Sequence, residues 1–368
     1  NVETDIMEIN NTMSRYLREG RFEEYPSALF YVERTLDSGK VRRGLIGMID
    51  LEQYNYEPGS NALIRATEGT VLSRIPPRVA VRKNAPIELP HVMLLVDDPE
   101  KTVIEPLSKQ TALMQKLYDF DLMEHGGHLR GWKLTEEQQE QVARALSVLA
   151  VPNQFNTRYG TKDEAVMLFA AGDGNHSLAT AKECYECQKR LTPPEQWASL
   201  PARYALVELD NLHDDSLVFE PIHRVVFGVR AEVLLEALNR YYPTALRGQH
   251  IPSEIREKSL CFSYISQESA GEIALLNPTS QLPVGALQAF LDDYLSSHPQ
   301  MRIDYIHGED VVRQLAAQPD TVGFLLPPMG KDALFPTVIH DGVLPRKTFS
   351  MGEAHDKRFY LEARKIRE

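Results

Sequence analysis

This chain of 368 residues has few cysteines, no long apolar run and no excess of positive charge. Each of these features argues against a class of protein. Three cysteines, an odd number, argue against a disulfide framework and favour a reducing, cytoplasmic location. No run of 18 apolar residues occurs, so no membrane span is expected. A net charge of -12 disfavours a nucleic-acid partner, because gripping phosphates needs clustered Lys and Arg.

The bulk composition is that of a globular protein with a sizeable core. Hydrophobic residues make up 43% of the chain and charged residues 25%, and a length of 368 residues favours two domains. We predict an N-terminal α/β domain over residues 1–200 and a C-terminal α/β domain with a basic tail over residues 201–368. Helical and strand patterns alternate in both, so the predicted fold class is α/β in its mixed α+β form, with mixed sheets flanked by helices.

The stretch with the densest polar chemistry is residues 170–181, which read AAGDGNHSLATA. An apolar run of strand type precedes it at residues 164–169, and residues 178–191 follow as a predicted helix. Gly172 and Gly174 let the backbone turn sharply and bring its amides close to a ligand. Because the first amides of a helix lack intrahelical partners, the turn favours an anion, typically a phosphate.

Polar side chains in this turn add further chemistry. Asn175 or Ser177 is expected to cap the helix through its side-chain oxygen. Asp173 supplies an acid, and His176 supplies a group that titrates near neutral pH. The competing interpretation is structural, since such a turn needs a glycine and a cap in any case. The run is more polar than a turn requires, which favours a functional site.

A second dense stretch, residues 62–87, carries clustered cations around Pro76-Pro77. One interpretation is a charged helix whose ion pairs face water. The other is a basic pocket for a phosphorylated ligand, with Arg78 on the phosphate and Glu68 as acid or base. The sequence leaves both open. The charged and hydroxyl residues concerned are Arg65, Glu68, Thr70, Arg74, Arg78, Arg82 and Lys83.

Two later basic positions are candidates for the same ligand. His223-Arg224 are predicted to leave a short strand, residues 216–219, in a turn, where they could face the ligand of Asp173. A buried histidine beside a surface arginine is the competing interpretation. Lys347 lies in the tail, residues 344–365, predicted as a loop and a solvated helix, and could place a point charge on a phosphate. Elsewhere we predict helices over 5–18, 108–120 and 135–150, a hairpin over 28–51 and a strand over 91–98.

Taken together, these segments resemble the DUF1015 family of soluble prokaryotic proteins, whose function as a family is unassigned. In that family a strand enters an Asp-Gly-His-His-Arg-like turn and a helix with a Thr-Ala pair. Here the turn reads Asp173-Gly174-Asn175-His176-Ser177, so Asn175 and Ser177 stand where the family has histidine and arginine. The resemblance continues, in the same order, at Thr67-Glu68-Gly69-Thr70 with Arg78, Pro221-Ile222-His223-Arg224, Tyr305-Ile306-His307-Gly308 and residues 344–349.

The same turn has a more distant likeness to the phosphate-binding turn of the ParB and sulfiredoxin-like fold. That fold includes nucleotide-using proteins and a free-serine kinase, in which the turn amides hold nucleotide phosphate and a Glu elsewhere is the base. The likeness implies that Asp173, Gly174 and His176 form a nucleotide turn and that Glu68 is the base. Fold analogy alone does not establish function.

Three hypotheses follow, and the favoured one is an ATP- or ADP-dependent phosphotransferase acting on a small molecule, with Mg²⁺ bridging phosphates and Asp173 as its ligand. A metal-dependent hydrolase using Asp173, His176, His223 and His307 is the second, and a non-catalytic nucleotide sensor the third. A homo-oligomer is left open. The favoured roles are catalysis by Glu68, Asp173 and His176, and phosphate or nucleotide binding by Gly172, Gly174, Asn175, Ser177, Arg78, His223, Arg224 and Lys347.

Overall fold

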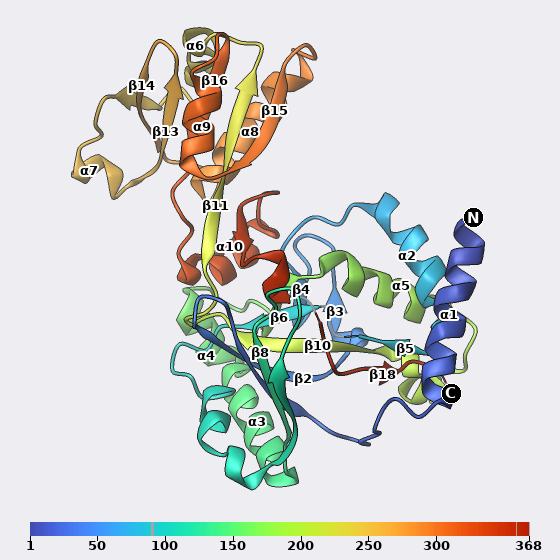
Figure 1. Ribbon diagram of the computed structural model, residues 1–368. Helices are drawn as coiled ribbons and strands as arrows, with labels where there is room; N and C mark the ends of the chain where they lie inside the picture. Colours follow the sequence, from blue (N-terminus) through green and yellow to red (C-terminus); the bar gives the residue numbers. More distant parts are fainter. Residues whose placement is uncertain (90–91, 358, 368) are drawn as a thin grey trace. The chain divides into compact units, whose positions relative to one another are not determined.

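The computed structural model of the protein describes residues 1–89, 92–357 and 359–367 (Figure 1). Contacts divide the chain into two compact units, Asn1–Leu217 with Glu353–Glu368, and Val218–Gly352. The predicted boundary after residue 200 falls earlier than this division, because residues 204–211 form a central strand of the first unit's sheet. The end of the tail also groups with the first unit rather than with the second.

The first unit is built on a nine-stranded mixed sheet. In spatial order its strands are β3 (Tyr54–Asn55), β4 (Ile64–Ala66), β9 (Phe169–Asp173), β6 (Met93–Val96), β10 (Tyr204–Asn211), β2 (Val41–Asp50), β1 (Phe30–Thr35), β8 (His128–Lys133) and β7 (Gln115–Asp121). The predicted hairpin is confirmed, since β1 and β2 pair antiparallel around Gly39, whose φ of +84° is left-handed. β10 runs antiparallel to β2 and parallel to β6, which makes the sheet mixed.

Helices flank this sheet, which confirms the predicted fold class (Figure 1). They are α1 (Val2–Arg18), α2 (Ile75–Arg82), α3 (Glu136–Leu149), α4 (Pro152–Tyr159) and α5 (Asn175–Arg190). α3 begins with a capping box, in which Thr135 Oγ1 accepts from the Gln138 amide and the Gln138 side chain accepts from the Thr135 amide. A separate two-stranded sheet joins β5 (Ile87–Glu88) to β18 (Arg364–Lys365) in the tail.

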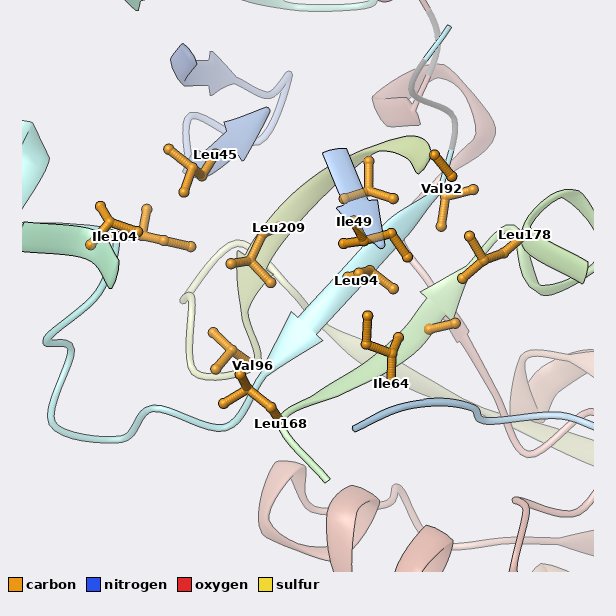
Figure 2. Close-up of a cluster of buried hydrophobic side chains, with 14 of the residues drawn as sticks. Leu45, Ile49, Ile64, Val92, Leu94, Val96, Ile104, Leu168, Leu178 and Leu209 are labelled. Carbon is orange, nitrogen blue, oxygen red and sulfur yellow. The ribbon is translucent and has the colours of Figure 1, made fainter. Parts of the chain in front are cut away.

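The core of the first unit fixes the start of α5 to the sheet. Every residue of β6 is buried, so this strand packs on both faces. Figure 2 shows Leu94 of β6 among side chains from β2, β4 and β10, with Leu178 of α5 beside them. Leu94 and Leu178 are fully buried. Burying one such leucine contributes about 2 kcal/mol, so the first turn of α5 is held firmly by packing.

The second unit contains a seven-stranded sheet and five helices among the residues that the structure describes. The strands, in spatial order, are β12 (Leu246–Gly248), β14 (Ala270–Leu276), β13 (Ser259–Ser266), β16 (Thr321–Leu325), β11 (Phe219–Phe227) and β15 (Arg302–His307), and β17 (Phe349–Met351) pairs with β11. The helices are α6 (Ala231–Tyr241), α7 (Ser253–Arg256), α8 (Pro283–Ser296), α9 (Glu309–Ala316) and α10 (Leu334–Asp341). Val226 and Phe324 are fully buried in its core.

Several local predictions are wrong. The helix predicted over residues 108–120 is replaced by 3-10 turns, Glu105–Lys109 and Thr111–Leu113, followed by β7, because residues 115–121 pair with β8. The strand predicted over 164–169 begins only at Phe169. The predicted tail helix is absent from the described residues, where one 3-10 turn, Ala354–Lys357, and two short strands occur.

The strand predicted over 91–98 is found as β6, although His91 lies outside the described residues. Over the described ranges, no helix has both the length and the apolar character needed to span a membrane.

Candidate functional site

The sharp turn between β9 and α5 forms where the glycine pattern predicts it. Gly174 is the N-cap of α5 and has φ +82°, in the left-handed region that glycine adopts without strain. Its amide donates to Asp173 Oδ1 at 2.8 Å. The N-cap is a glycine without a side chain, and Asn175 and Ser177 lie inside the helix, so the prediction that one of them is the N-cap residue is wrong. The helix therefore starts on a backbone turn, with Asn175, His176 and Ser177 in its first turn.

Asn175 instead joins the turn to the segment that follows β4. It is buried, and its side-chain oxygen accepts from the Thr67 amide at 3.2 Å. Its side-chain nitrogen lies 3.3 Å from Thr67 Oγ1 and 3.4 Å from the Ala171 carbonyl. Thr67 Oγ1 donates in turn to the Ala171 carbonyl at 2.6 Å. This closed set of bonds places the Thr67-Glu68-Gly69-Thr70 segment beside the start of α5.

His176 makes a second link to the same segment. The Val71 amide donates to His176 Nε2 at 3.1 Å, so the ring accepts at Nε2 and carries its proton at Nδ1. Partial burial lowers the pKa of His176, and the positive charges of Arg74 and Arg78 lower it further. The ring is therefore neutral near pH 7, with its basic nitrogen already engaged.

The cations of residues 62–87 separate into two groups. Arg65 is buried and donates to the Ala62 and Ala165 carbonyls, and Arg82 pairs with Glu88 at 2.6 Å, so both are structural. Arg74 and Arg78 are exposed, and α2, which carries Arg78, packs against α5. Both charges act on His176. The two interpretations of this stretch thus apply to different residues within it.

Glu68 lies on the same segment, one residue after Thr67, and its side chain is exposed. The bonds from Thr67 and Val71 to α5 hold the backbone on both sides of it. Glu68 is therefore an exposed residue on a segment that is bonded to α5 on both sides of it.

Lys357, from the tail, completes the charges around the turn. Its Nζ lies 2.9 Å from Asp173 Oδ2, and Asp173 is 45% exposed. Arg34 and Arg42 hold the backbone beside it by donating to the Asp356 carbonyl at 2.7 and 2.8 Å. Sequence reasoning did not assign Lys357 to this site, because no local pattern indicates which residues a returning tail will meet.

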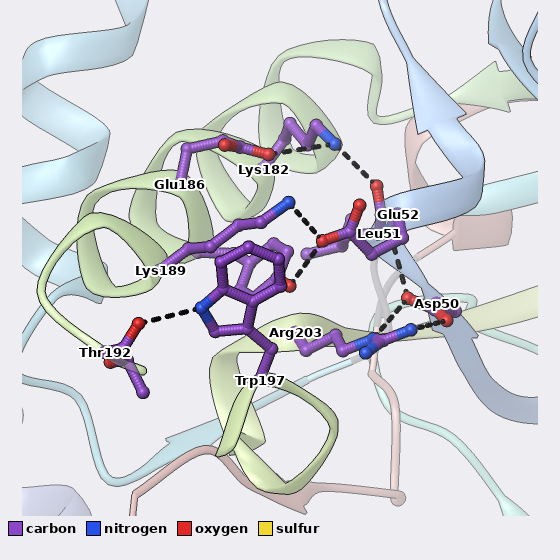
Figure 3. A network of polar contacts seen from close by, with 10 residues as sticks. Asp50, Leu51, Glu52, Lys182, Glu186, Lys189, Thr192, Trp197 and Arg203 are labelled. Atoms are coloured by element: carbon purple, nitrogen blue, oxygen red, sulfur yellow. Dashed lines mark hydrogen bonds and ion pairs between the residues drawn. The ribbon is translucent and has the colours of Figure 1, made fainter. Parts of the chain in front are cut away.

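The far part of α5 is anchored to the end of β2 and the 3-10 turn after it (Figure 3). Lys182 donates to the Leu51 carbonyl at 2.8 Å. Lys189 and Tyr185 both bind Glu52, at 2.5 and 2.6 Å. Because these bonds fix the body of α5, its first turn has a stable direction relative to the sheet.

The three remaining candidates belong to the second unit. His223 and Arg224 lie inside β11 rather than in a turn after a strand, which corrects that prediction. His223 Nδ1 accepts from the Leu326 amide at 3.0 Å, and burial lowers the pKa of His223. Arg224 is fully buried, so the competing interpretation is right about the histidine and wrong about the arginine. Lys347 is exposed, and its carbonyl accepts from Arg224 at 2.8 Å.

The donor set gives limited support to a metal. Among the residues that the structure describes, no group of three or more His, Cys, Asp or Glu is arranged to hold a metal ion. Asp173 offers one carboxylate, which suits Mg²⁺ only with a ligand's phosphates, since Mg²⁺ is usually bound by one or two carboxylates plus substrate phosphates. Lys357 already occupies one of its oxygens.

Comparisons with known proteins give one match in sequence and several in structure. A family model described as "Protein of unknown function (DUF1015)" matches residues 1–294. No curated protein matches the chain in sequence.

Two solved structures illustrate the structural similarity. A conserved hypothetical protein from Pyrococcus furiosus is 10% identical, with 84% of this chain and 91% of that chain covered and a TM-score of 0.41. A mutant free serine kinase in complex with ADP is 11% identical, with 90% and 92% covered and a TM-score of 0.43. At such identities and scores, the similarities carry no conclusion about what this chain binds or catalyses.

Proposed function

This chain belongs to the DUF1015 family, whose function is unknown, and we propose that its first unit binds the phosphates of a nucleotide at the start of α5 and transfers a phosphoryl group to a small hydroxyl-bearing acceptor. The single observation that carries the proposal is the convergence of a 16-residue helix's first turn with two exposed arginines. The helix amides and Arg74 and Arg78 would neutralise phosphate charge together.

The two catalytic candidates take different roles in this proposal. His176 Nε2 is already bonded to the Val71 amide, so His176 positions the 67–71 segment rather than accepting a proton. Glu68 is exposed on that segment and would accept the proton of the acceptor hydroxyl as its oxygen attacks the terminal phosphorus. The nucleoside diphosphate leaves with the electron pair of the broken P–O bond.

Mg²⁺ and Lys357 would compete for the Asp173 carboxylate when a nucleotide is bound. Mg²⁺ would shield the phosphates, and Asp173 is the carboxylate that would hold it. Because Lys357 pairs with Asp173 Oδ2, the ammonium either stays as a counter-charge for phosphate or gives way to the ion. Asn175 keeps a supporting role, since both ends of its amide are bonded inside the protein.

The test separates binding from turnover. Calorimetric titration with ADP and Mg²⁺ should show one binding site. The double substitution of Arg74→Ala with Arg78→Ala should lower the affinity of that site for ADP. Glu68→Gln should keep ADP binding but abolish the formation of ADP from ATP. Phosphorus NMR measures this formation in the presence of a panel of hydroxyl-bearing metabolites. No heat of binding with either nucleotide would defeat the proposal.

The sensor hypothesis predicts a different result from the same experiment. Tight ADP binding with no ATP consumption by the wild-type protein over hours, with every acceptor in the panel, would favour a non-catalytic nucleotide sensor. The hydrolase hypothesis is the second candidate, and it has less support: His223 Nδ1 already accepts from the Leu326 amide, and the described residues include no group of three or more His, Cys, Asp or Glu arranged to hold a metal ion.

A further inference from the structure

A separate hollow of about 440 Å³ opens on the first unit, lined by residues of the α1–β1 connection, β7 and the tail. Its volume lies within the usual range for small-molecule sites, about 300–1,000 Å³. Phe22, Tyr25 and Phe30 line it, with the Tyr25 and Phe30 rings edge to face at 5.9 Å. Phe22 is 38% exposed, more than a side chain that only fills a core. The walls thus present aromatic surface to whatever enters.

The cations that line this hollow are all engaged by carboxylates. Lys365 pairs with Glu24 at 3.1 Å, and Arg364 pairs with Glu88 at 2.7 Å and also donates to two backbone carbonyls. Arg21 pairs with Glu19 at 2.6 Å. A negatively charged ligand would have to displace one of these carboxylates, which makes an anion a poor fit.

The inner end of the hollow is acidic. Glu362 is only 8% exposed, and the Tyr118 hydroxyl donates to its Oε1. Over the described ranges, no Lys, Arg or His pairs with this carboxyl. Burial raises the pKa of Glu362, and the negative charge of Glu208 raises it further. Charged groups are normally buried only with a partner of opposite sign, so this carboxyl lacks the counter-charge it would need when ionised.

We propose that this hollow is a binding site for a small aromatic amine, whose ring packs against Phe22, Tyr25 and Phe30 and whose ammonium group bonds to Glu362 and Tyr118. The ammonium supplies the missing counter-charge, and its N–H groups reach acceptors on both side chains. Aromatic faces also favour a cation, and the Tyr25 ring already has Lys133 Nζ 5.6 Å from its centroid. This site is independent of the nucleotide site proposed at α5.

The experiment compares three probes that share a phenethyl group and differ in the polar group at its end, on the protein of residues 1–368, by ligand-observed NMR and calorimetry. Phenethylamine should bind, phenethyl alcohol should bind at least tenfold more weakly, and hydrocinnamate should not bind. Glu362→Gln should weaken phenethylamine at least tenfold and leave the alcohol nearly unchanged. Glu100→Gln removes an exposed acid that does not line the hollow and is the matched control, with no more than a twofold effect expected.

Folding of each variant is checked by its far-ultraviolet spectrum and by its thermal unfolding, which do not depend on the nucleotide site. If Glu362→Gln fails to fold, the ranking of the three probes on the wild-type protein decides alone. Equal affinity for all three probes, or binding of hydrocinnamate in preference to phenethylamine, would overturn the proposal. Absence of phenethylamine binding would overturn it as well.

Discussion

Two stretches, the Asp173 turn and β11, each contribute a histidine that the sequence makes a candidate for a ligand site, and the two differ in structure. Near the Asp173 turn, Arg74 and Arg78 of the α2 segment are exposed, and the Asp173 side chain is 45% exposed. In β11, Arg224 is fully buried and His223 is 5% exposed. The charges near the Asp173 turn are open to solvent, whereas the side chains of His223 and Arg224 are buried within the second unit.

The partners of the two groups explain the difference. Arg224 donates to Gln288 at 3.0 Å and to the carbonyls of Ile222, Lys347 and Arg346 at 2.6 to 2.8 Å. Its guanidinium also lies 4.9 Å from the Tyr305 ring. Two of these carbonyls, those of Arg346 and Lys347, belong to the loop after α10, so Arg224 holds that loop to β11 and its role is structural. A charged residue near a histidine indicates a ligand site only when its hydrogen-bonding capacity is not consumed by the protein.

The strongest test of this contrast is Arg224→Ala. Four acceptors would lose their donor inside the second unit, so we expect a loss of about 3 kcal/mol or more in the free energy of unfolding. Urea denaturation of the full chain measures it. Arg346→Ala is the matched control, because that side chain is exposed and pairs with Asp292 on the surface, and its cost should stay below about 1 kcal/mol. Equal effects of the two substitutions would remove the contrast.

Asn175→Ala tests the bonds that bring the 67–71 segment to α5. Removing a buried amide that bonds to Thr67 and Ala171 should cost about 1–3 kcal/mol, and it should weaken ADP binding as well. Asn153→Ala, at an exposed position of α4, should change stability by less than about 0.5 kcal/mol. An Asn175 variant with wild-type stability would show that the segment is held by other contacts.

Arg78→Ala should behave in the opposite way to Arg224→Ala. Because Arg78 is exposed, the free energy of unfolding should change by less than about 0.5 kcal/mol. ADP affinity should fall about tenfold, equivalent to about 1.4 kcal/mol. Lys83→Ala removes the same charge from the C-cap of α2, five residues further along the chain, and should leave the titration unchanged. Loss of affinity in both variants would indicate a general effect of charge.

The smallest expected effect concerns pH. The folded-state pKa of His223 and of His176 is lowered, mainly by burial. Each histidine therefore contributes stability that is present above its unfolded pKa, about 6.5, and is lost as the pH falls through its folded pKa. His223→Gln should flatten the decline in stability below pH 6.5. In NMR titrations, ADP should raise the pKa of His176 and leave that of His223 unchanged.

Local signals predicted those parts of the fold that depend on neighbouring residues. The capping box from Thr135 to Gln138, the hairpin at Gly39 and the glycine turn before α5 all occur as expected. Gly174 sets the turn by its left-handed φ, which needs no distant partner. These features are encoded within a few residues of one another, so a sequence alone can reveal them.

Features that depend on partners far away in the chain could not be predicted from the sequence. Residues 115–120 were predicted as helix, but pairing with β8 makes them a strand. Asn175 bonds to Thr67 instead of capping its own helix, and Lys357 arrives from the tail. The roles of Glu68, Asp173 and His176 stay predictions until a ligand is bound.

The most direct measurement is an ADP titration of isotope-labelled protein followed through backbone amide shifts. We expect the largest shifts at Asn175, His176 and Ser177, with Arg78 side-chain signals moving at the same ADP concentration. Shifts confined to other parts of the chain, or no shifts at millimolar ADP, would contradict it.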